Sequence, residues 1–250
     1  MFAKNKPAKT DLKKYRHELK YIINSGYYHI LRSRLKSAMK TDPHGENGIY
    51  RITSLYFDDV FRTGYNDKLL GLDVRKKYRV RYYNLSPSVI RLEVKEKKGE
   101  MVCKRSVPLT SSEFERLIKG ERDFLKQDKY INTAAEEFCL SDRLTALFPA
   151  VLVDYQREAY ICPAGNVRIT FDSGLKTALN FKGTEEKTEF INVFGEGEII
   201  LEVKYDSFIP SYIKDLLSGI PLTRESVSKF VLCSDKLTEV SKCSFYQQIS

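Results

Sequence analysis

The stretch VRKKYRVRYY, residues Val74–Tyr83, carries the strongest pattern in this chain of 250 residues. Every second position is basic, namely Arg75, Lys77, Arg79 and Arg81, whereas the positions between them are mostly apolar. Side chains alternate between the two faces of a β-strand, so this period of two places the four basic groups on one face. The stretch therefore predicts a strand with one cationic and one apolar face.

The same alternation recurs elsewhere in the chain. A charged face recurs on at least six segments, among them Tyr15–Ile23, Val74–Tyr83, Val89–Lys97, Val167–Asp172 and Ile199–Tyr205, whereas the strand Met101–Val107 has Lys104 on one face and Arg105 on the other. Further strands are expected over Ile49–Asp58 and Val151–Tyr160. Helices are expected over Tyr27–Met39, from the capping-box sequence Thr110–Glu113, over Thr133–Phe148, from Pro210 to Leu217 and over Ser226–Lys236. The chain is thus predicted to be of the α+β class.

Two sheet architectures produce such alternation. An ordinary antiparallel sheet has one polar face in water. A closed β-barrel instead sends alternate residues into its interior, with helices covering an apolar exterior. The charged face here recurs on at least six segments and is rich in Arg with Glu interspersed, which favours the closed antiparallel barrel. An interior with so many cations must hold water and a polyanion, because uncompensated buried charge is costly.

Composition limits the alternatives further. Lys and Arg number 42 against 33 Asp and Glu, which gives a net charge of +9 and indicates an anionic partner. No apolar run is long enough for a membrane span, and the N-terminus lacks the apolar segment of a signal peptide. We expect a single domain over residues 13–236, a flexible basic arm over 1–12 and a C-terminal tail over 237–250.

Cysteine, histidine and glycine exclude several common sites. The five cysteines are an odd number without a CxxC pair, which argues against a disulfide framework or a zinc cluster. Reduced thiols are the expected state, and they favour a cytoplasmic location. The three histidines are scattered, and no glycine-rich phosphate loop is present.

The alternating charges suit phosphate chemistry. Arg offers a planar fork of donors to phosphate oxygens, and Lys offers a point charge. The interspersed carboxylates Glu18, Glu93 and Glu202 are suitable oxygen ligands for Mg²⁺ or Mn²⁺, which commonly bridge to phosphate. A salt bridge to a neighbouring basic residue is the alternative role for each of them.

Eight short motifs, in order along the chain, resemble the VTC domain, the polyphosphate-polymerase branch of the triphosphate tunnel enzymes. They are Arg16–Tyr21, Ser54–Asp58, Lys77–Arg81, Leu92–Lys95, Tyr155–Arg157, Val167–Asp172, Leu201–Lys204 and Ser228–Phe230. The resemblance implies a β-barrel tunnel that transfers the γ-phosphate of ATP to a growing polyphosphate chain with a divalent metal, Mn²⁺ or Mg²⁺. The residues implied to bind phosphate are Lys20, Arg79, Arg81, Lys95, Lys104, Arg157, Arg168 and Lys229. Of these, Lys20 and Lys104 are implied only to bind, the others also to act in catalysis, and Glu202 is the implied metal ligand.

The sequence departs from the family pattern at two positions. Arg16 stands where the related triphosphatase and cyclase branch has the first Glu of an E-x-E-x-K strand, which argues against that branch. Ser226 stands where eukaryotic polymerase-branch members have a second lysine. Two other functions stay open: a metal-dependent hydrolase of triphosphate or nucleoside triphosphates, and a non-catalytic polyphosphate-binding module. ATP and polyphosphate are the expected partners, and nucleic acid is a less favoured one because the charged face is inferred to be closed.

Overall fold

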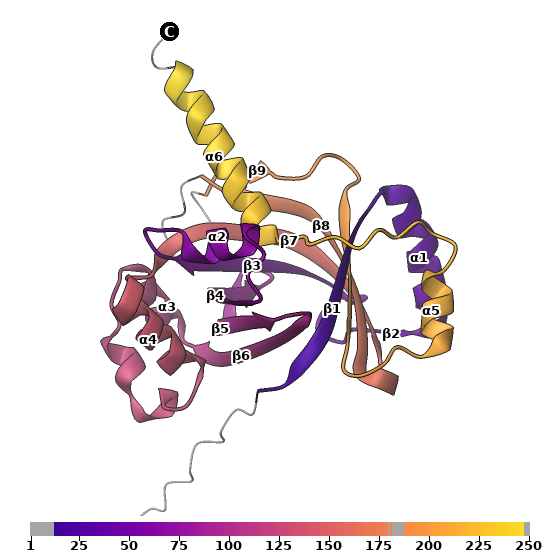
Figure 1. Cartoon of the computed structure of the whole chain (residues 1–250), viewed down its shortest axis with the longest axis horizontal. Helices are drawn as coiled ribbons and strands as arrows, with labels where there is room; N and C mark the ends of the chain where they lie inside the picture. Colours follow the sequence, from indigo (N-terminus) through magenta and orange to yellow (C-terminus); the bar gives the residue numbers. More distant parts are fainter. Residues whose placement is uncertain (1–12, 180, 182–187, 248–250) are drawn as a thin grey trace, which may run out of the picture.

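One antiparallel sheet organises the protein. The computed structural model describes residues 13–179, 181 and 188–247. Within them the strands are β1 (Tyr15–Ile23), β2 (Lys40–Thr41), β3 (Ile49–Asp58), β4 (Val74–Tyr83), β5 (Ser86–Lys98), β6 (Met101–Leu109), β7 (Phe148–Cys162), β8 (Val167–Ala178), β9 (Phe190–Asn192) and β10 (Ile199–Tyr205). Their order is β2-β7-β3-β4-β5-β6-β1-β10-β8-β9, and β7 also pairs with β8. This last pairing closes eight of the strands into a ring, which confirms the predicted closed antiparallel sheet (Figure 1).

Most of the helices lie outside the ring, as predicted for the α+β class, and the C-terminal helix reaches the ring interior with its first turn (Figure 1). The helices are α1 (Ser25–Ala38), α2 (Thr63–Leu69), α3 (Ser111–Ile118), α4 (Ala134–Thr145), α5 (Ser211–Leu217) and α6 (Lys229–Gln247). Short 3-10 turns occupy Asp123–Lys126, Asp128–Tyr130 and Ala164–Asn166. None of the described helices is long and apolar enough to cross a membrane.

The predicted capping box is present at the start of α3. The Glu113 amide donates to Thr110 Oγ1 over 3.2 Å, and the Thr110 amide donates to Glu113 Oε2 over 2.8 Å. Helix α2 is not predicted from the sequence, because its seven residues carry no apolar period. Two aspartates of the preceding segment organise its start: the Gly64 amide donates to Asp58 Oδ1 and the Thr63 amide to Asp59 Oδ1.

The C-terminal helix differs from its predicted bounds. It begins at Lys229 and continues past residue 236 to Gln247, so it crosses the expected boundary between domain and tail. Residues 1–12, the expected arm, lie outside the described residues, as do 248–250 of the expected tail. Apart from α2 and the short strands β2 and β9, which are not predicted, the order of elements from β1 to the start of α6 follows the predicted one.

Apolar side chains pack on both outer flanks of the ring and at one place inside it. Leu117 of α3 and Phe138 of α4 are fully buried against strands β3 to β6. Leu31 of α1 and Ile213 of α5 cover β8 and β10 in the same way. A third cluster joins inward-facing residues of β3, β7 and β8 to Phe230 in the first turn of α6. The helices therefore leave the charged faces of the strands turned inward, and α6 packs against the ring interior.

Candidate functional site

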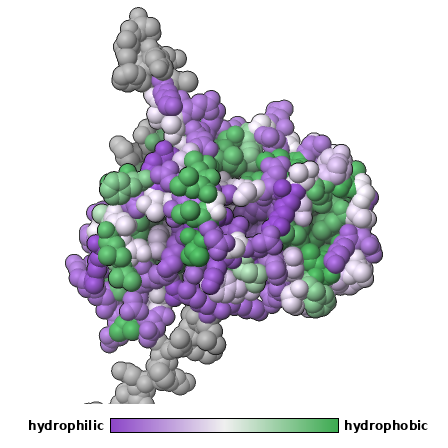
Figure 2. Space-filling model, viewed as in Figure 1, coloured by the Kyte–Doolittle hydropathy of each residue, from purple (hydrophilic) through white to green (hydrophobic). Residues whose placement is uncertain are grey.

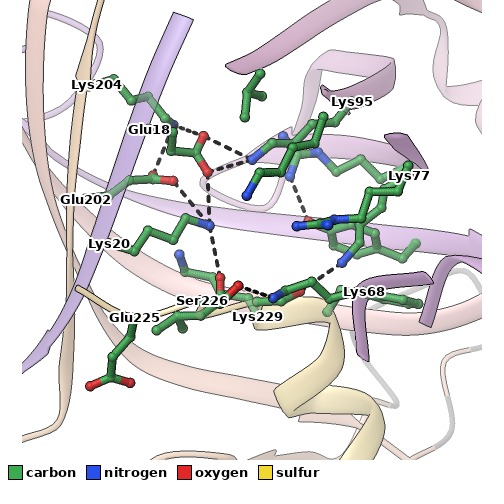
Figure 3. Close-up of a pocket in the computed structure, with 18 of the residues that line it drawn as sticks. Glu18, Lys20, Lys68, Lys77, Lys95, Glu202, Lys204, Glu225, Ser226 and Lys229 are labelled. Carbon is green, nitrogen blue, oxygen red and sulfur yellow. Dashed lines mark hydrogen bonds and ion pairs between the residues drawn. The ribbon is translucent and has the colours of Figure 1, made fainter. Parts of the chain in front are cut away.

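A cavity of about 340 Å³ lies among the inward-facing charged side chains. Among the described residues, twelve Lys and Arg side chains but only three glutamates line it. The basic ones are Lys20, Lys68, Arg75, Lys77, Arg79, Arg81, Lys95, Lys97, Arg157, Lys204, Arg224 and Lys229. Figure 2 shows hydrophilic residues gathered at the centre of the face that looks into the ring, and Figure 3 shows the lining from close by. The excess positive charge of the chain is thus concentrated in one cavity inside the ring.

Strand register creates this arrangement. Direct cross-strand partners share a face of the sheet and lie close together. β1 and β10 pair so that Glu18 is opposite Lys204 and Lys20 is opposite Glu202. Each basic residue of this pair of strands therefore faces a carboxylate, and the two carboxylates are diagonal neighbours inside the ring.

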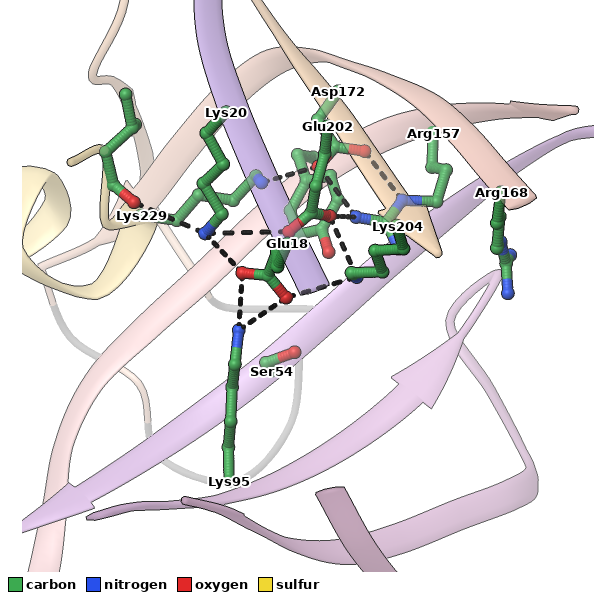
Figure 4. A network of polar contacts seen from close by, with 12 residues as sticks. Glu18, Lys20, Ser54, Lys95, Arg157, Arg168, Asp172, Glu202, Lys204 and Lys229 are labelled. Atoms are coloured by element: carbon green, nitrogen blue, oxygen red, sulfur yellow. Dashed lines mark hydrogen bonds and ion pairs between the residues drawn. The ribbon is translucent and has the colours of Figure 1, made fainter. Parts of the chain in front are cut away.

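Glu18 and Glu202 are the centre of an ionic network (Figure 4). Lys20 Nζ lies 3.1 Å from Glu18 Oε1 and 3.5 Å from Glu202 Oε1. Lys204 Nζ lies 3.0 Å from Glu202 Oε2 and 3.6 Å from Glu18 Oε2. Lys95 Nζ, which comes from β5 across the cavity, donates to Glu18 Oε1 over 2.8 Å. Two ammonium groups thus bridge the carboxylate pair, and a third joins it to the opposite wall.

Asp172 extends the network toward helix α6. Arg157 Nε donates to Asp172 Oδ1 over 2.6 Å, and Arg157 Nη2 donates to Glu202 Oε2 over 3.2 Å. Lys229 Nζ, at the first residue of α6, lies 2.5 Å from Asp172 Oδ2 and over the ring of Tyr155. Because Asp172 is almost fully buried, its two basic partners hold their positions before any ligand binds.

Arg79 and Arg81 occupy the wall formed by β4. Arg79 Nη2 lies 2.6 Å from Oε2 of Glu93, which is fully buried, and Arg79 Nη1 donates to the hydroxyl of Tyr56 over 2.7 Å. Arg81 has weaker partners: its Nε donates to Ser54 Oγ over 3.1 Å, and its Nη1 is 3.9 Å from Glu93. Arg81 is therefore the guanidinium of this pair with more capacity to bind an anion.

Neighbouring cations keep the two central carboxylates ionised. Burial by itself raises the pKa of a carboxyl, because it penalises the charged form. For Glu18, burial and the nearby Glu202 raise the pKa, but the ammonium groups around it, led by that of Lys20, outweigh both and hold it well below its usual range. For Glu202, burial is again opposed, chiefly by Lys204 and Lys20, and its pKa is also held well below the usual range.

The lysines of the network differ in how firmly they hold their protons. Burial lowers the pKa of a lysine, but Glu18 and Glu202 outweigh burial at Lys20 and raise its pKa above the usual value. At Lys95 burial is stronger than the attraction of Glu18, so its pKa falls to about 8. Lys95 is thus a cation that loses its charge near neutral to mildly alkaline pH.

Seven of the nine residues that the sequence predicts for the site line this cavity. They are Lys20, Arg79, Arg81, Lys95, Arg157, Glu202 and Lys229. Lys104 is not in the described lining: it lies behind Glu93, with its Nζ 2.8 Å from Glu93 Oε1. Arg168 is also outside that lining and instead contacts Asp42 and the hydroxyl of Tyr50, as its separate position in Figure 4 shows. Their predicted phosphate-binding roles remain predictions.

Several lining residues are absent from the predicted set. Lys204 has a clear signal, since it follows Glu202 by two positions on the same strand face. Lys97 likewise continues the alternation of Glu93 and Lys95. Lys68 has no such signal, because it lies on the unpredicted helix α2 and reaches the cavity only through the tertiary fold.

The acidic side chains of the cavity suit a substrate-bound metal. No group of three or more metal-binding side chains occurs among the described residues, so the protein offers no closed metal cage there. Glu18 and Glu202 nevertheless present ionised oxygen donors beside the cavity. Mg²⁺ is typically held by one or two carboxylates together with substrate phosphates. The donor set therefore fits a divalent ion that arrives with a phosphate substrate.

Solved structures and a family model match this chain. A putative adenylyl cyclase from Hippeastrum, described as having a dominant triphosphatase activity, has the same fold, with a TM-score of 0.53, 14% identity, and coverage of 90% of this chain and 96% of the other. A putative adenylate cyclase from Bacillus halodurans has a TM-score of 0.49 and 13% identity, with coverage of 78% and 82%. No curated protein matches the chain significantly. The VTC domain, however, matches residues 15–238, and this protein therefore belongs to the VTC domain family.

Proposed function

We propose that this protein is a polyphosphate polymerase that transfers the γ-phosphate of ATP to the end of an inorganic polyphosphate chain. The observation that supports the proposal is the cavity inside the ring, which twelve basic and three acidic residues of the described part of the chain line. A linear phosphate chain needs many donors arranged along a path, and alternate positions of neighbouring strands supply such a path. Membership of the VTC domain family supports the same activity.

Positioning and charge neutralisation are the main requirements of phosphoryl transfer. In the proposed reaction, Arg81, Lys95 and Arg157 hold the reacting phosphates in line. Glu18 and Asp172 keep Lys95 and Arg157 fixed, so these two side chains need little reorganisation when the substrate binds, whereas Arg81 contacts only Ser54 at close range. The terminal phosphate of the chain attacks the γ-phosphorus as an ionised oxygen, so no side chain has to remove a proton from it. The bond between the γ-phosphorus and the β–γ bridging oxygen breaks, and ADP leaves.

A divalent metal held by Glu202, with Glu18 beside it, would neutralise charge on the phosphate oxygens. Mn²⁺ and Mg²⁺ are the expected ions because the available donors are carboxylate oxygens. Without such an ion, Lys20 and Lys204 neutralise the same carboxylates. When the metal enters the cavity together with ATP, the positive charge of the metal and the negative charge of the phosphates are therefore added together.

Hydrolysis of triphosphate is the second candidate. The fold likeness to the Hippeastrum protein, whose description names a triphosphatase activity, favours this candidate. The two reactions differ in whether water or a phosphate oxygen attacks the γ-phosphorus. Incubation of the purified protein with ATP and Mn²⁺, followed by gel electrophoresis and an orthophosphate assay, separates them: acid-precipitable chains support the polymerase, and orthophosphate without chains supports the hydrolase.

A further inference from the structure

The basic side chains along β4 and β5 form a ladder that leads out of the central network. Successive inward pairs across the two strands are Arg79 with Glu93, Lys77 with Lys95, and Arg75 with Lys97. Residues two positions apart on a strand are separated by about 7 Å. The ladder therefore places positive charge at regular intervals in a line, as an extended phosphate chain would require.

Compensation by carboxylates decreases along this ladder. Arg79 is paired closely with Glu93 at the inner end, and Lys95 is paired with Glu18 at the next step. Lys77 lies at the same step, opposite Lys95, and Arg75 and Lys97 form the next step outward, where Lys68 of helix α2 joins them. We call Lys68, Arg75, Lys77 and Lys97 the mouth cluster. Among the described residues, no carboxylate lies within ion-pair distance of any of the four, although all four line the cavity.

The partners of the mouth cluster are neutral oxygen atoms. Lys68 Nζ donates to Ser226 Oγ over 2.5 Å, and Lys77 Nζ donates to Ser228 Oγ over 2.9 Å. Both serines belong to residues 218–228, the segment between α5 and α6 that runs past β1 (Figures 1 and 3). The Glu225 amide of this segment donates to the Lys20 carbonyl over 2.9 Å, which fixes the segment to the ring. Hydroxyl groups satisfy the lysine donors but leave their charges uncompensated.

Burial and mutual repulsion both disfavour the charged forms of the lysines in the cluster. Burial, then Arg75 and Lys97, lowers the pKa of Lys68 to about 8. Burial, then Lys20, Lys95 and Lys68, holds the pKa of Lys77 well below the usual value. Lys97 is shifted in the same direction, chiefly by burial and then by Arg75. A bound anion would relieve this repulsion at several side chains together.

We propose that the mouth cluster is a second phosphate subsite, which holds phosphate groups of a linear polyphosphate beyond those bound by the inner network. This inference rests on the proposed function, because it assigns the longer substrate of the same cavity. A triphosphate that occupies the inner network does not need the mouth cluster, whereas a long chain that follows β4 and β5 contacts it. The cluster therefore selects for chain length.

The test is the ratio of affinities for long-chain polyphosphate and tripolyphosphate, measured by isothermal titration calorimetry at fixed salt. The informative variant is the double substitution Lys68→Gln and Lys97→Gln. Lys98→Gln is the matched control, because Lys98 is adjacent in sequence but lies on the opposite face of β5, is exposed, and is outside the described cavity lining. We expect the double variant to lower the preference for the long chain about tenfold, and the control to leave it unchanged.

Three results would overturn the inference. If the double variant weakens both ligands by the same factor, or weakens neither, while the unmodified protein binds tripolyphosphate, the mouth cluster is not a separate subsite and the proposed function stands. If Lys98→Gln lowers the ratio as much as the double variant, the effect is general surface electrostatics. If the unmodified protein binds neither ligand, the inference and the proposed function both fail.

Discussion

Lys20 of β1 and Glu202 of β10 are direct partners across the sheet, and Lys20 Nζ lies 3.5 Å from Glu202 Oε1. The residue expected to bind phosphate is therefore held by the residue expected to bind metal. A buried ion pair of this kind costs free energy to desolvate, and its retention is better explained by preorganisation of the site than by stability. The ion pairs at the inner end of the cavity are thus arranged, before binding, for a substrate that consists of an anionic phosphate and a bound metal cation.

Glu202→Gln should separate stability from activity. The substitution removes the negative charge shared by Lys20, Lys204 and Arg157, so the free energy of unfolding should fall by about 3 kcal/mol in urea titrations. Polyphosphate synthesis should fall at least about 100-fold because charge stabilisation is lost. Glu121→Gln, which alters a surface ion pair with Arg116, is the control for both. Full activity in Glu202→Gln would refute the assigned role.

Arg79 and Arg81 should behave differently when each is replaced by Met. Arg79→Met leaves the fully buried Glu93 without its closest partner, and we expect a loss of about 3 kcal/mol in stability. Arg81→Met orphans no carboxylate at close range, so stability should change by less than about 1 kcal/mol. Calorimetry should nevertheless show about tenfold weaker tripolyphosphate binding by Arg81→Met. Equal loss of stability in both variants would contradict this account of the wall.

Phosphate binding should weaken as the pH rises from 7 to 9. The pKa of Lys68 and that of Lys95 are each about 8 in the free protein, chiefly because of burial. A bound anion stabilises the protonated amines and raises both pKa values, so binding near pH 8 should take up protons. Calorimetry of long-chain polyphosphate in two buffers with different ionisation enthalpies measures this uptake. Proton release, or affinity that is constant over this range, would exclude the two lysines as anion ligands.

Alternation in the sequence accounts for most of the site. The period of two at Arg79, Arg81 and Lys95 predicts an inward charged face, and the closed ring confirms it. Site residues near the ends of these strands are harder to predict, because a side chain on the inward face of a strand can still lie beyond the cavity. Arg168 shows this: it shares a strand face with Asp172 but contacts Asp42 instead of the cavity.

The alternation of charged and apolar residues does not predict those parts of the site that only the tertiary fold brings to the cavity. Lys68 reaches the cavity from a short helix whose start depends on two aspartate side chains, and no periodicity in the sequence indicates that helix. Residues 218–228 are held by contacts with distant segments, among them the backbone hydrogen bond from Glu225 to Lys20, the ion pair between Arg224 and Glu100, and the serine contacts with Lys68 and Lys77. Such contacts join distant segments and leave no local signal.

The most direct test of the central claim follows the γ-phosphate of ATP. The purified protein is incubated with Mn²⁺ and ATP labelled either at the γ- or at the α-phosphate, and the products are separated on a gel. The proposed polymerase incorporates the γ-label into chains that exopolyphosphatase degrades and excludes the α-label. Release of all γ-label as orthophosphate, with no labelled chains at any ATP concentration, would contradict the claim.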